Sequence, residues 1–188
     1  MDALLTSFIA TLFAEFGDKT QLLVAALAAG YRRPVAILVA LALAAAVSAV
    51  IAAFAGIAVH GMITSRAATL LAALALLYAG AAGLWRAKQP TAMSPGKMPV
   101  LVVAFICVLA AEMGDKTQFL TFAFAARFDS FALAAIGSTA GVIVANVPAA
   151  ALGASYATSV PLKPVRIAIA ALFLLFGAIT ALSALRLI

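Results

Sequence analysis

Long apolar runs separated by short polar breaks occupy almost the whole chain. Six runs are long enough to cross the hydrocarbon core of a membrane as helices, which takes about 20 residues each. The breaks between them carry glycine, proline and charged residues, which commonly interrupt helices. The predicted spans cover residues 3–29, 35–59, 67–86, 99–126, 131–155 and 164–187.

Composition agrees with a membrane location for these runs. Of the 188 residues, 67% are hydrophobic and 10% are charged, and the mean hydropathy is +1.22. A soluble domain is only about half apolar, so lipid is the solvent that suits this chain. The first run is long and carries charges in its middle, so we expect a retained span and not a cleaved signal peptide.

The net charge of +6 does not indicate a nucleic-acid partner. The basic residues lie singly or in pairs between apolar runs, as loop-end anchors of membrane proteins do, and do not gather on one polar surface. We therefore expect the lipid bilayer as a partner and no nucleic acid.

The chain is a duplication. Moving residues 15–29 forward by 97 positions places them on residues 112–126, where ten of fifteen residues are identical. Gly56 and Gly153 correspond at the same offset. The predicted domains are a first repeat at 1–86, a linker at 87–98 and a second repeat at 99–188.

Each repeat holds three spans, so the second repeat must enter the membrane from the opposite side. The predicted fold class is therefore an all-α membrane protein of six transmembrane helices, built as two inverted three-helix repeats. The positive-inside rule then places the linker in the cytoplasm and both termini outside, since seven basic residues favour the linker side and three the other. The seven are Arg32, Arg33, Arg86, Lys88, Lys97, Lys163 and Arg166, and the three are Arg66, Arg127 and Arg186.

The repeated segment carries an acidic motif, with the letters EFGDKT at residues 15–20 and EMGDKT at residues 112–117. These two motifs hold four of the six acidic residues and lie near the middle of spans 1 and 4. A charged residue at that depth costs roughly 2.5–3.5 kcal/mol and is a functional candidate by default. Gly17 and Gly114 lack side chains, so either another backbone approaches there or the helix unwinds.

The chemistry of the motifs favours a hard divalent cation. Glu15 and Asp18 share a helical face, and the same holds for the second motif. Four carboxylates and two lysines sum to a charge of −2, which one divalent cation balances. All side-chain ligands available in the motifs are oxygens, which suit Mg²⁺, Ca²⁺ and Mn²⁺. Clustered carboxylates repel one another once the metal leaves and then take up protons, so exchange of cation for H⁺ follows naturally.

The duplicated Glu-x-Gly-Asp-Lys/Arg-Thr/Ser pattern resembles the GDT family of Mn²⁺/Ca²⁺:H⁺ exchangers, the Golgi manganese and calcium transporters and their bacterial relatives. The resemblance covers nearly the whole chain. It implies that the protein is a transporter and not an enzyme, with no cofactor, and that it exports Mn²⁺ or Ca²⁺ across a bacterial inner membrane in exchange for H⁺. The implied metal ligands are Glu15, Asp18, Glu112 and Asp115, the secondary ion-path candidates are Thr20, Gln21, Thr117 and Gln118, and the charge-compensating residues are Lys19 and Lys116. Thr20 and Thr117 can reach the site only if the helices break at the motifs.

Other interpretations stay open at this stage. The motif charges could form structural salt bridges alone. A proton-coupled exporter of an organic solute, such as an amino acid, could use lysines beside carboxylates, and an intramembrane enzyme could use paired carboxylates. The sequence ranks neither Mn²⁺ against Ca²⁺ nor one ion site against two. It also leaves the exchange stoichiometry, the conformational state and the oligomeric state open, and a homo-oligomer is compatible with it.

Polar and small residues inside the other spans are assigned to packing. Ser48 and Asn146 are expected to hydrogen-bond a neighbouring helix, although Asn146 is also a candidate for lining the path. The segment 137–141, with a glycine at each end, is typical of close helix packing.

Overall fold

The computed structural model describes residues 1–85 and 98–187, and its regular structure in these ranges is entirely helical. The predicted linker, 87–98, lies outside the described residues except for Met98, and so do Arg86, Lys88 and Lys97. The elements are α1 (Asp2–Glu15), α2 (Lys19–Tyr31), α3 (Pro34–His60), α4 (Ser65–Leu84), α5 (Val100–Glu112), α6 (Lys116–Phe128), α7 (Phe131–Leu152), the short 3₁₀ turn η1 (Gly153–Ser155), α8 (Tyr156–Ser159) and α9 (Leu162–Leu185).

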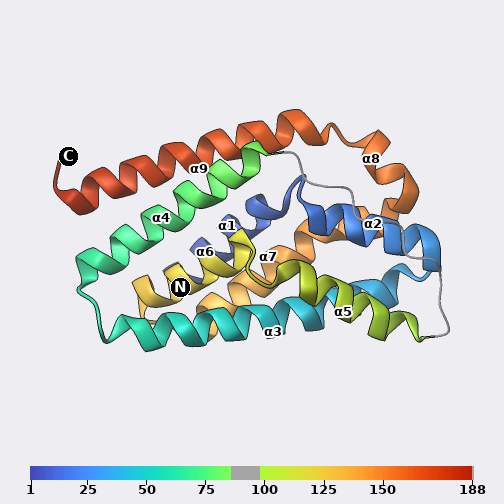
Figure 1. Cartoon of the computed structure of the whole chain (residues 1–188), viewed down its shortest axis with the longest axis horizontal. Coiled ribbons are helices and arrows are strands. Elements are labelled where there is room, and N and C mark those ends of the chain that lie inside the picture. The colour runs from blue at the N-terminus through green and yellow to red at the C-terminus, as the bar shows by residue number, and fades with distance from the viewer. Residues whose placement is uncertain (86–97, 188) are drawn as a thin grey trace.

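Each predicted span corresponds to a helix or to a pair of helices, with bounds that differ by a few residues. Among the described residues, four helical segments are long and apolar enough to cross a membrane: Pro34–His60, Ser65–Leu84, Phe131–Ser159 and Leu162–Leu185. The first and fourth spans are each broken in two, into α1 with α2 and α5 with α6. Figure 1 shows both breaks near the middle of the long axis of the molecule.

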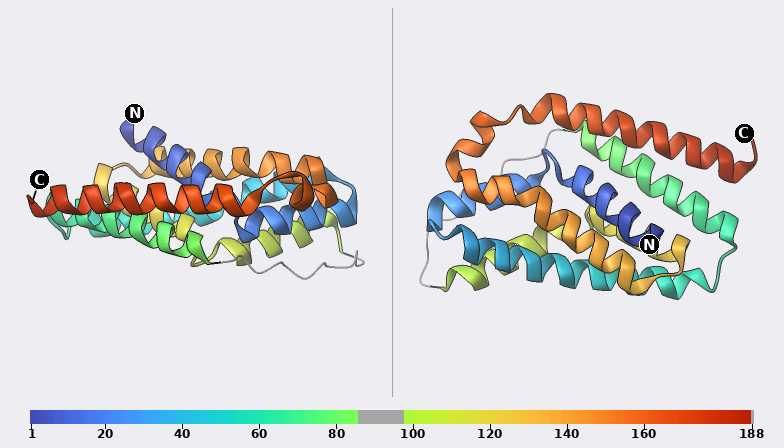
Figure 2. Two further views of the ribbon diagram at one scale, coloured as in Figure 1. Left: turned by 90° about the horizontal axis from the view of Figure 1, so that it is seen from above. Right: turned by 180° about the vertical axis from the view of Figure 1, so that it is seen from behind.

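The helices run roughly along one axis, with the connections at its two ends. Both termini lie toward the end where α3 meets α4, and α5 begins at the opposite end (Figure 1). α4 packs along α9, α1 packs along α7, and α3 packs against α5, α6 and α7. The two views in Figure 2 show the α4–α9 pair along one edge of the bundle. This path matches two inverted three-span halves.

One contact between α4 and α9 shows the two-fold relation of the halves directly. Gly80 and Gly177 correspond at the offset of 97, and so do Leu77 and Leu174. A Cβ added at Gly80 would lie 2.8 Å from Cγ of Leu174, and one added at Gly177 would lie 2.8 Å from Cγ of Leu77. Each glycine therefore receives the leucine of the other repeat.

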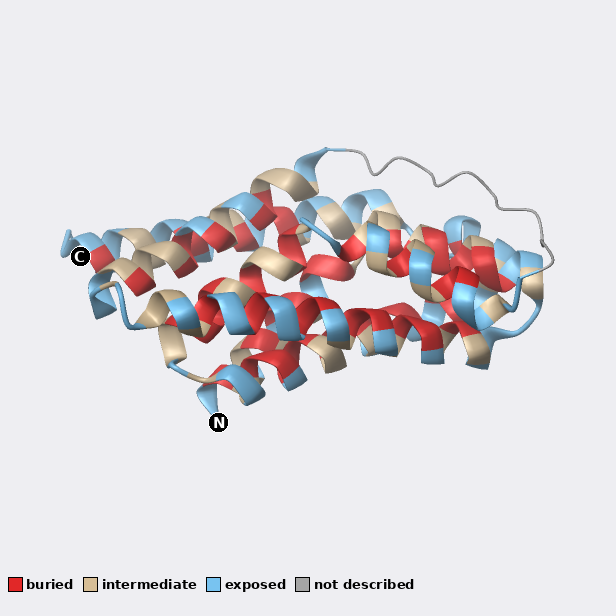
Figure 3. Ribbon diagram, turned by 60° about the horizontal axis from the view of Figure 1, so that its bottom comes forward, coloured by how far each residue is buried: buried red, intermediate tan, exposed pale blue. Residues whose placement is uncertain are grey.

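Small residues let the helices approach closely. Most buried apolar residues are alanines, which is expected where no hydrophobic force drives helices together inside lipid. Large apolar side chains such as Phe54 of α3 and Leu175 and Ile179 of α9 are exposed on the outside. Figure 3 shows exposed residues along the outer surface of the bundle and buried ones where its helices meet. This distribution suits a protein surrounded by lipid.

The predicted packing role of segment 137–141 is confirmed. A Cβ added at Gly137 would overlap the backbone carbonyl of Leu4, and one added at Gly141 would overlap the Thr11 hydroxyl. Both glycines lie on α7 against α1, so the close packing fixes the first half-helix against the second repeat.

The glycines of α3 and its cap provide a test of this packing. Gly56 lies against α6, where an added Cβ would overlap the carbonyl oxygen of Phe122 and lie 2.8 Å from Cβ of Ala125. We expect Gly56→Ala to lower the free energy of unfolding by about 1–3 kcal/mol. Thermal unfolding in detergent measures this. Gly61→Ala is the matched control, because a Cβ there meets nothing within 4 Å; equal losses in the two variants would contradict the packing role.

Candidate functional site

Each acidic motif folds as a turn between two half-helices. At the first motif Phe16 has φ −64° and ψ 123°, Gly17 has φ +73°, and the Asp18 amide donates to the Glu15 carbonyl at 3.1 Å. These values match a type II turn, whose third residue needs the positive φ that glycine tolerates. At the second motif Met113 has φ −66° and ψ 121°, Gly114 has φ +75°, and the corresponding hydrogen bond is 3.2 Å. The helix is therefore unwound at both glycines, which is one of the two alternatives that the sequence left open.

The glutamine that follows each motif holds its turn in place. Oε1 of Gln21 accepts a hydrogen bond from the Gly17 amide at 2.8 Å, and Oε1 of Gln118 accepts one from the Gly114 amide at 2.8 Å. These bonds satisfy amides that the broken helices leave without a partner. Both amide oxygens are engaged with the backbone, and their direct role in the ion path stays a prediction.

The lysines pair across the two repeats. Nζ of Lys19 lies 2.7 Å from Oδ1 of Asp115, and Nζ of Lys116 lies 2.7 Å from Oδ2 of Asp18. Lys116 also lies 3.9 Å from Oδ2 of Asp115. The sequence places Lys19 beside Glu15 on an ideal helix, but the break turns it toward the other repeat. Crossed pairs of this kind tie the two turns together.

Three of the four predicted metal ligands meet at this point. Glu15, Asp18 and Asp115 each offer a carboxylate oxygen, and these oxygens lie within 4.8 Å of one another. Oε1 of Glu15 is buried and has no hydrogen-bond partner among the described residues. The carboxyl end of α1 also points here, and its helix dipole favours a cation. The cluster therefore has the oxygen set and an unused oxygen that a divalent cation can take.

Glu112, the fourth predicted ligand, is held by hydroxyls. The Thr20 hydroxyl donates to Oε1 of Glu112 at 2.8 Å, and the Thr117 hydroxyl donates to Oε2 at 3.1 Å. The helix breaks bring both threonines to the centre, as the sequence requires if they contribute to the site. Both threonine hydroxyls donate to Glu112 and neither donates to Glu15, so the two duplicated glutamates have different surroundings. Direct ligation by Glu112 stays a prediction.

The two turns are also covered differently. Gly17 is buried under the start of α9, where an added Cβ would lie 3.1 Å from Cβ of Arg166. Gly114 is exposed, and a Cβ there would meet nothing within 4 Å. A hollow of about 710 Å³ between α3, α4 and α6 reaches Gly114, Asp115 and Gln118. The second motif is therefore accessible from the flank of the molecule in this conformation, and the first is covered.

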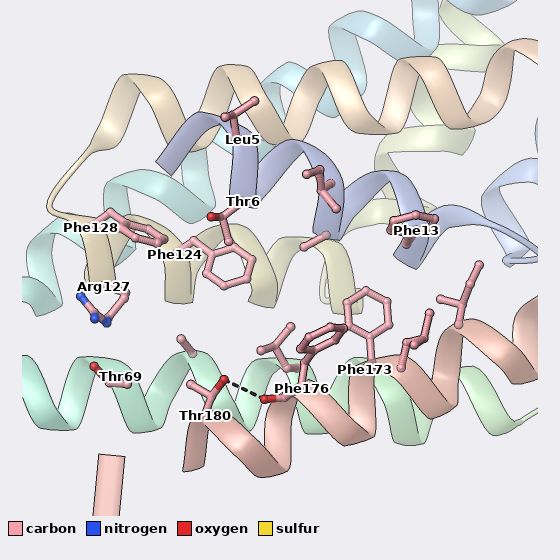
Figure 4. A pocket seen from close by; sticks show the side chains of 16 residues that line it. Leu5, Thr6, Phe13, Thr69, Phe124, Arg127, Phe128, Phe173, Phe176 and Thr180 are labelled. Carbon is pink, nitrogen blue, oxygen red and sulfur yellow. Dashed lines mark hydrogen bonds between the residues drawn. The ribbon is translucent and has the colours of Figure 1, made fainter. Parts of the chain in front are cut away.

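A separate apolar cavity does not belong to this site. It measures about 530 Å³ and lies between α1, α4, α6 and α9. In Figure 4, Phe124 and Phe128 of α6 lie on one side and Phe173 and Phe176 of α9 on the other. No carboxylate lines it, so it offers nothing to a divalent cation.

Two residues outside the motifs support the site. Nδ2 of Asn146 lies 3.4 Å from Oε2 of Glu15, and the Tyr156 hydroxyl donates to Oε1 of Gln21 at 2.6 Å. The sequence singled out Asn146 because it is an amide side chain inside an apolar span. In the structure it makes the predicted contact with a neighbouring helix, through Glu15 of α1. No sequence signal marked Tyr156, because α8 brings it to Gln21 only through the turn after α7.

Comparison with known proteins agrees with this geometry. The chain matches the family described as "Divalent cation/proton antiporter GDT1" over residues 3–91 and 100–187, one match for each half. It is 34% identical over 182 residues to a protein of Vibrio cholerae serotype O1 described as "Putative manganese exporter", a match that covers 96% of this chain and 91% of that protein. The chain matches no solved structure.

The two turn glycines predict unequal sensitivity to the same substitution. Gly17→Ala and Gly114→Ala both force alanine into a positive φ, which costs about 1–2 kcal/mol. At position 17 the new Cβ would also lie 3.2 Å from the carbonyl oxygen of Leu162. We therefore expect Gly17→Ala to lower the unfolding temperature in detergent more than Gly114→Ala does. A larger loss at position 114 would contradict the difference in cover.

Proposed function

The chain belongs to the divalent cation/proton antiporter GDT1 family, and on this premise we propose that it exports Mn²⁺ from the cytoplasm in exchange for H⁺ at the crossed helix breaks. Family membership makes it a multi-pass membrane transporter of divalent cations and protons, which removes the organic-solute and enzyme interpretations. The finer claims are the choice of Mn²⁺, its direction of transport and the residues that bind it.

The observation that carries the proposal is the convergence of acids from both repeats. Glu15 and Asp18 come from the first motif and Asp115 from the second, with ligand oxygens within 4.8 Å. The protein's one histidine, His60, binds the Ala126 carbonyl at the end of α3, away from the motifs. A site with oxygen ligands alone suits Mn²⁺ or Ca²⁺ and disfavours metals that prefer thiolate or imidazole. The description of the Vibrio cholerae relative favours Mn²⁺ of the two.

The lysines supply the positive charge that the cation replaces. In this structure Asp18 and Asp115 are paired with Lys116 and Lys19. An arriving divalent cation attracts both aspartates, and the lysine pairs loosen. When the cation leaves, lysines and protons restore the charge balance, because close carboxylates do not all remain ionised without a counter-charge. Cation and proton thus compete for one centre, which is the requirement for exchange.

Orientation follows from the basic residues. The positive-inside rule favours the linker side as the cytoplasm and places both termini outside the bacterial inner membrane. An inward proton gradient then drives Mn²⁺ outward. Movement of one repeat against the other would expose the centre alternately to the two sides.

Flux measurements test the proposed exchange. In proteoliposomes with an imposed pH gradient, wild type should move Mn²⁺, whereas Glu15→Gln and Glu112→Gln should lose at least about 90% of the rate, since each removes a charge the centre needs. Asp129→Asn is the matched control, because Asp129 lies in the connection after α6 and its positive φ of 49° suits asparagine. Full activity of both glutamine variants would contradict the proposed site and leave the motifs as structural salt bridges. If the wild type moved Ca²⁺ but not Mn²⁺, the proposed substrate would be wrong.

The two lysines predict different effects on stability. The Lys116 side chain is 7% exposed and that of Lys19 is 40% exposed. Removing Lys116 leaves the largely buried Asp18 without its partner and costs about 3 kcal/mol or more, whereas Asp115 still has Lys116 at 3.9 Å when Lys19 is removed. We expect Lys116→Gln to lower the unfolding temperature in EDTA far more than Lys19→Gln does.

Added Mn²⁺ should restore most of the stability lost in Lys116→Gln, because the cation replaces the missing charge beside Asp18. Thermal unfolding across a Mn²⁺ titration measures this. A Lys116→Gln protein that Mn²⁺ stabilises no more than wild type would contradict the proposed competition between lysine and cation.

A further inference from the structure

Buried hydroxyl side chains connect the acidic centre with the half of the bundle that leads to the termini. They are Ser7 and Thr11 of α1, Ser48 of α3, Thr121 of α6 and Ser138 of α7. Each is at most 3% exposed. Burying a hydroxyl in an apolar bundle is unfavourable unless it is hydrogen-bonded. Five of them in one region therefore call for a reason.

Four of these hydroxyls follow one another from Glu112 toward the N-terminus, and Ser48 lines the small cavity beside Thr121 and Ser138. The Thr117 hydroxyl donates to the Glu112 carboxylate, and Thr121 lies one turn further along α6, where its hydroxyl donates to the Thr117 carbonyl at 2.8 Å. A carbonyl oxygen accepts but does not pass a proton on, so a proton route needs a water between these two hydroxyls. The hydroxyls of Thr121 and Ser138 lie 2.5 Å apart. Thr11 continues the series by donating to the Ser138 carbonyl at 3.2 Å.

The series ends one turn further along α1. Thr11 also donates to the Ser7 carbonyl at 2.7 Å. The Ser7 hydroxyl oxygen is buried and has no hydrogen-bond partner within the described part of the chain. An unsatisfied buried hydroxyl is a position where water or a passing proton carrier can bind. Since α1 runs from the N-terminus to the first break, Ser7 marks the end of the series toward the terminus side.

The duplication supplies an internal comparison. At the offset of 97, every one of the five positions is apolar in the other repeat, where the corresponding residues lie on the linker side. These residues are Ala104, Val108, Ala145, Val24 and Leu41, and each is 0% exposed. The same helix packing is thus built on the linker side without hydroxyls. Packing does not explain their presence on the terminus side.

The space at the Glu112 end of the series is too small for the cation. A cavity of about 10 Å³ lies among Ser48, Glu112, Thr117, Thr121 and Ser138, which is about the room that one water needs. Mn²⁺ prefers about six oxygen ligands in octahedral geometry and cannot bring them through such a gap. Protons need only hydrogen-bonding groups and single waters.

We propose that Ser7, Thr11, Ser48, Thr121 and Ser138 form the route by which the exchanged proton travels between the terminus side of the membrane and the acidic centre, a route separate from the one that the cation takes. This rests on the proposed function, since it gives the proton of that exchange a path. On the linker side, the positions that correspond to Thr121 and Ser138 hold Val24 and Leu41, which offer no hydroxyl.

Removal of single hydroxyls tests the route. Thr121→Val and Ser138→Ala remove the hydroxyls that meet at 2.5 Å while retaining most of the side-chain volume. Reconstituted protein should show pH-gradient-driven Mn²⁺ flux and the accompanying proton flux reduced about tenfold, equivalent to about 1.4 kcal/mol in the barrier. Mn²⁺ binding, measured by titration calorimetry in detergent, should change less than about twofold, because neither residue contacts the carboxylate cluster.

Two further variants serve as controls. Thr139→Val removes a neighbouring hydroxyl that is only partly buried and does not line the small cavity, and it should exchange like wild type. Thr121→Ser keeps the hydroxyl and should retain the exchange rate that Thr121→Val loses. Slower exchange in D₂O, with a larger isotope effect in Ser138→Ala than in wild type, is the further signature of a limiting proton step.

Several outcomes would overturn the route. One is wild-type exchange in Thr121→Val and Ser138→Ala, and another is an equal loss in Thr121→Ser and Thr121→Val, which would indicate a packing role. Loss of Mn²⁺ binding together with flux would also overturn it, because the hydroxyls would then belong to the cation site. Absence of exchange in wild type would instead overturn the proposed function, so the two failures are distinguishable.

Discussion

Lys116 and Asp18, which belong to opposite halves of the chain, meet at 2.7 Å inside an apolar helical bundle, and Lys19 and Asp115 repeat the contact. An unpaired charge at the centre of a bilayer costs roughly 2.5–3.5 kcal/mol. The shortest contact of each aspartate is with the lysine of the other half, so each half depends on the other to fold in lipid. The helix breaks, the inverted arrangement and the placement of the carboxylates all serve this pairing.

Duplication gives the halves the same motif but not the same surroundings. Glu112 receives two threonine hydroxyls, while Glu15 lies beside Asn146 and keeps one oxygen without a hydrogen bond among the described residues. Position 49, which corresponds to Asn146, is an alanine. One turn is covered by α9 and the other is exposed.

Much of the fold could be predicted from the sequence. Runs of apolar residues predicted six spans to within a few residues, since spanning lipid requires a fixed helix length. The offset of 97 predicted the repeat, and the odd number of spans in each half predicted its inversion. The duplicated motif predicted the family through its resemblance to known exchangers. The depth of its acids predicted a functional site, because charged residues inside the membrane are rare without a function. Hydrophobic periodicity did not predict the helix breaks, because EFGD and EMGD are compatible with a continuous helix. Only the motif glycines and threonines suggested a break.

The sequence by itself determined which residues carry charge, how often they recur and which metals oxygen ligands suit. Only the tertiary structure decided their partners. An ideal helix places Lys19 beside Glu15, but the type II turn directs it to Asp115. The turn also engages Gln21 with the Gly17 amide and brings Thr20 to Glu112. Local rules reach about one helical turn along the chain, whereas the Lys19–Asp115 and Thr20–Glu112 contacts join segments more than 90 residues apart. The apolar surroundings favour these contacts, because burying a charge or a hydroxyl is unfavourable unless it is paired or hydrogen-bonded.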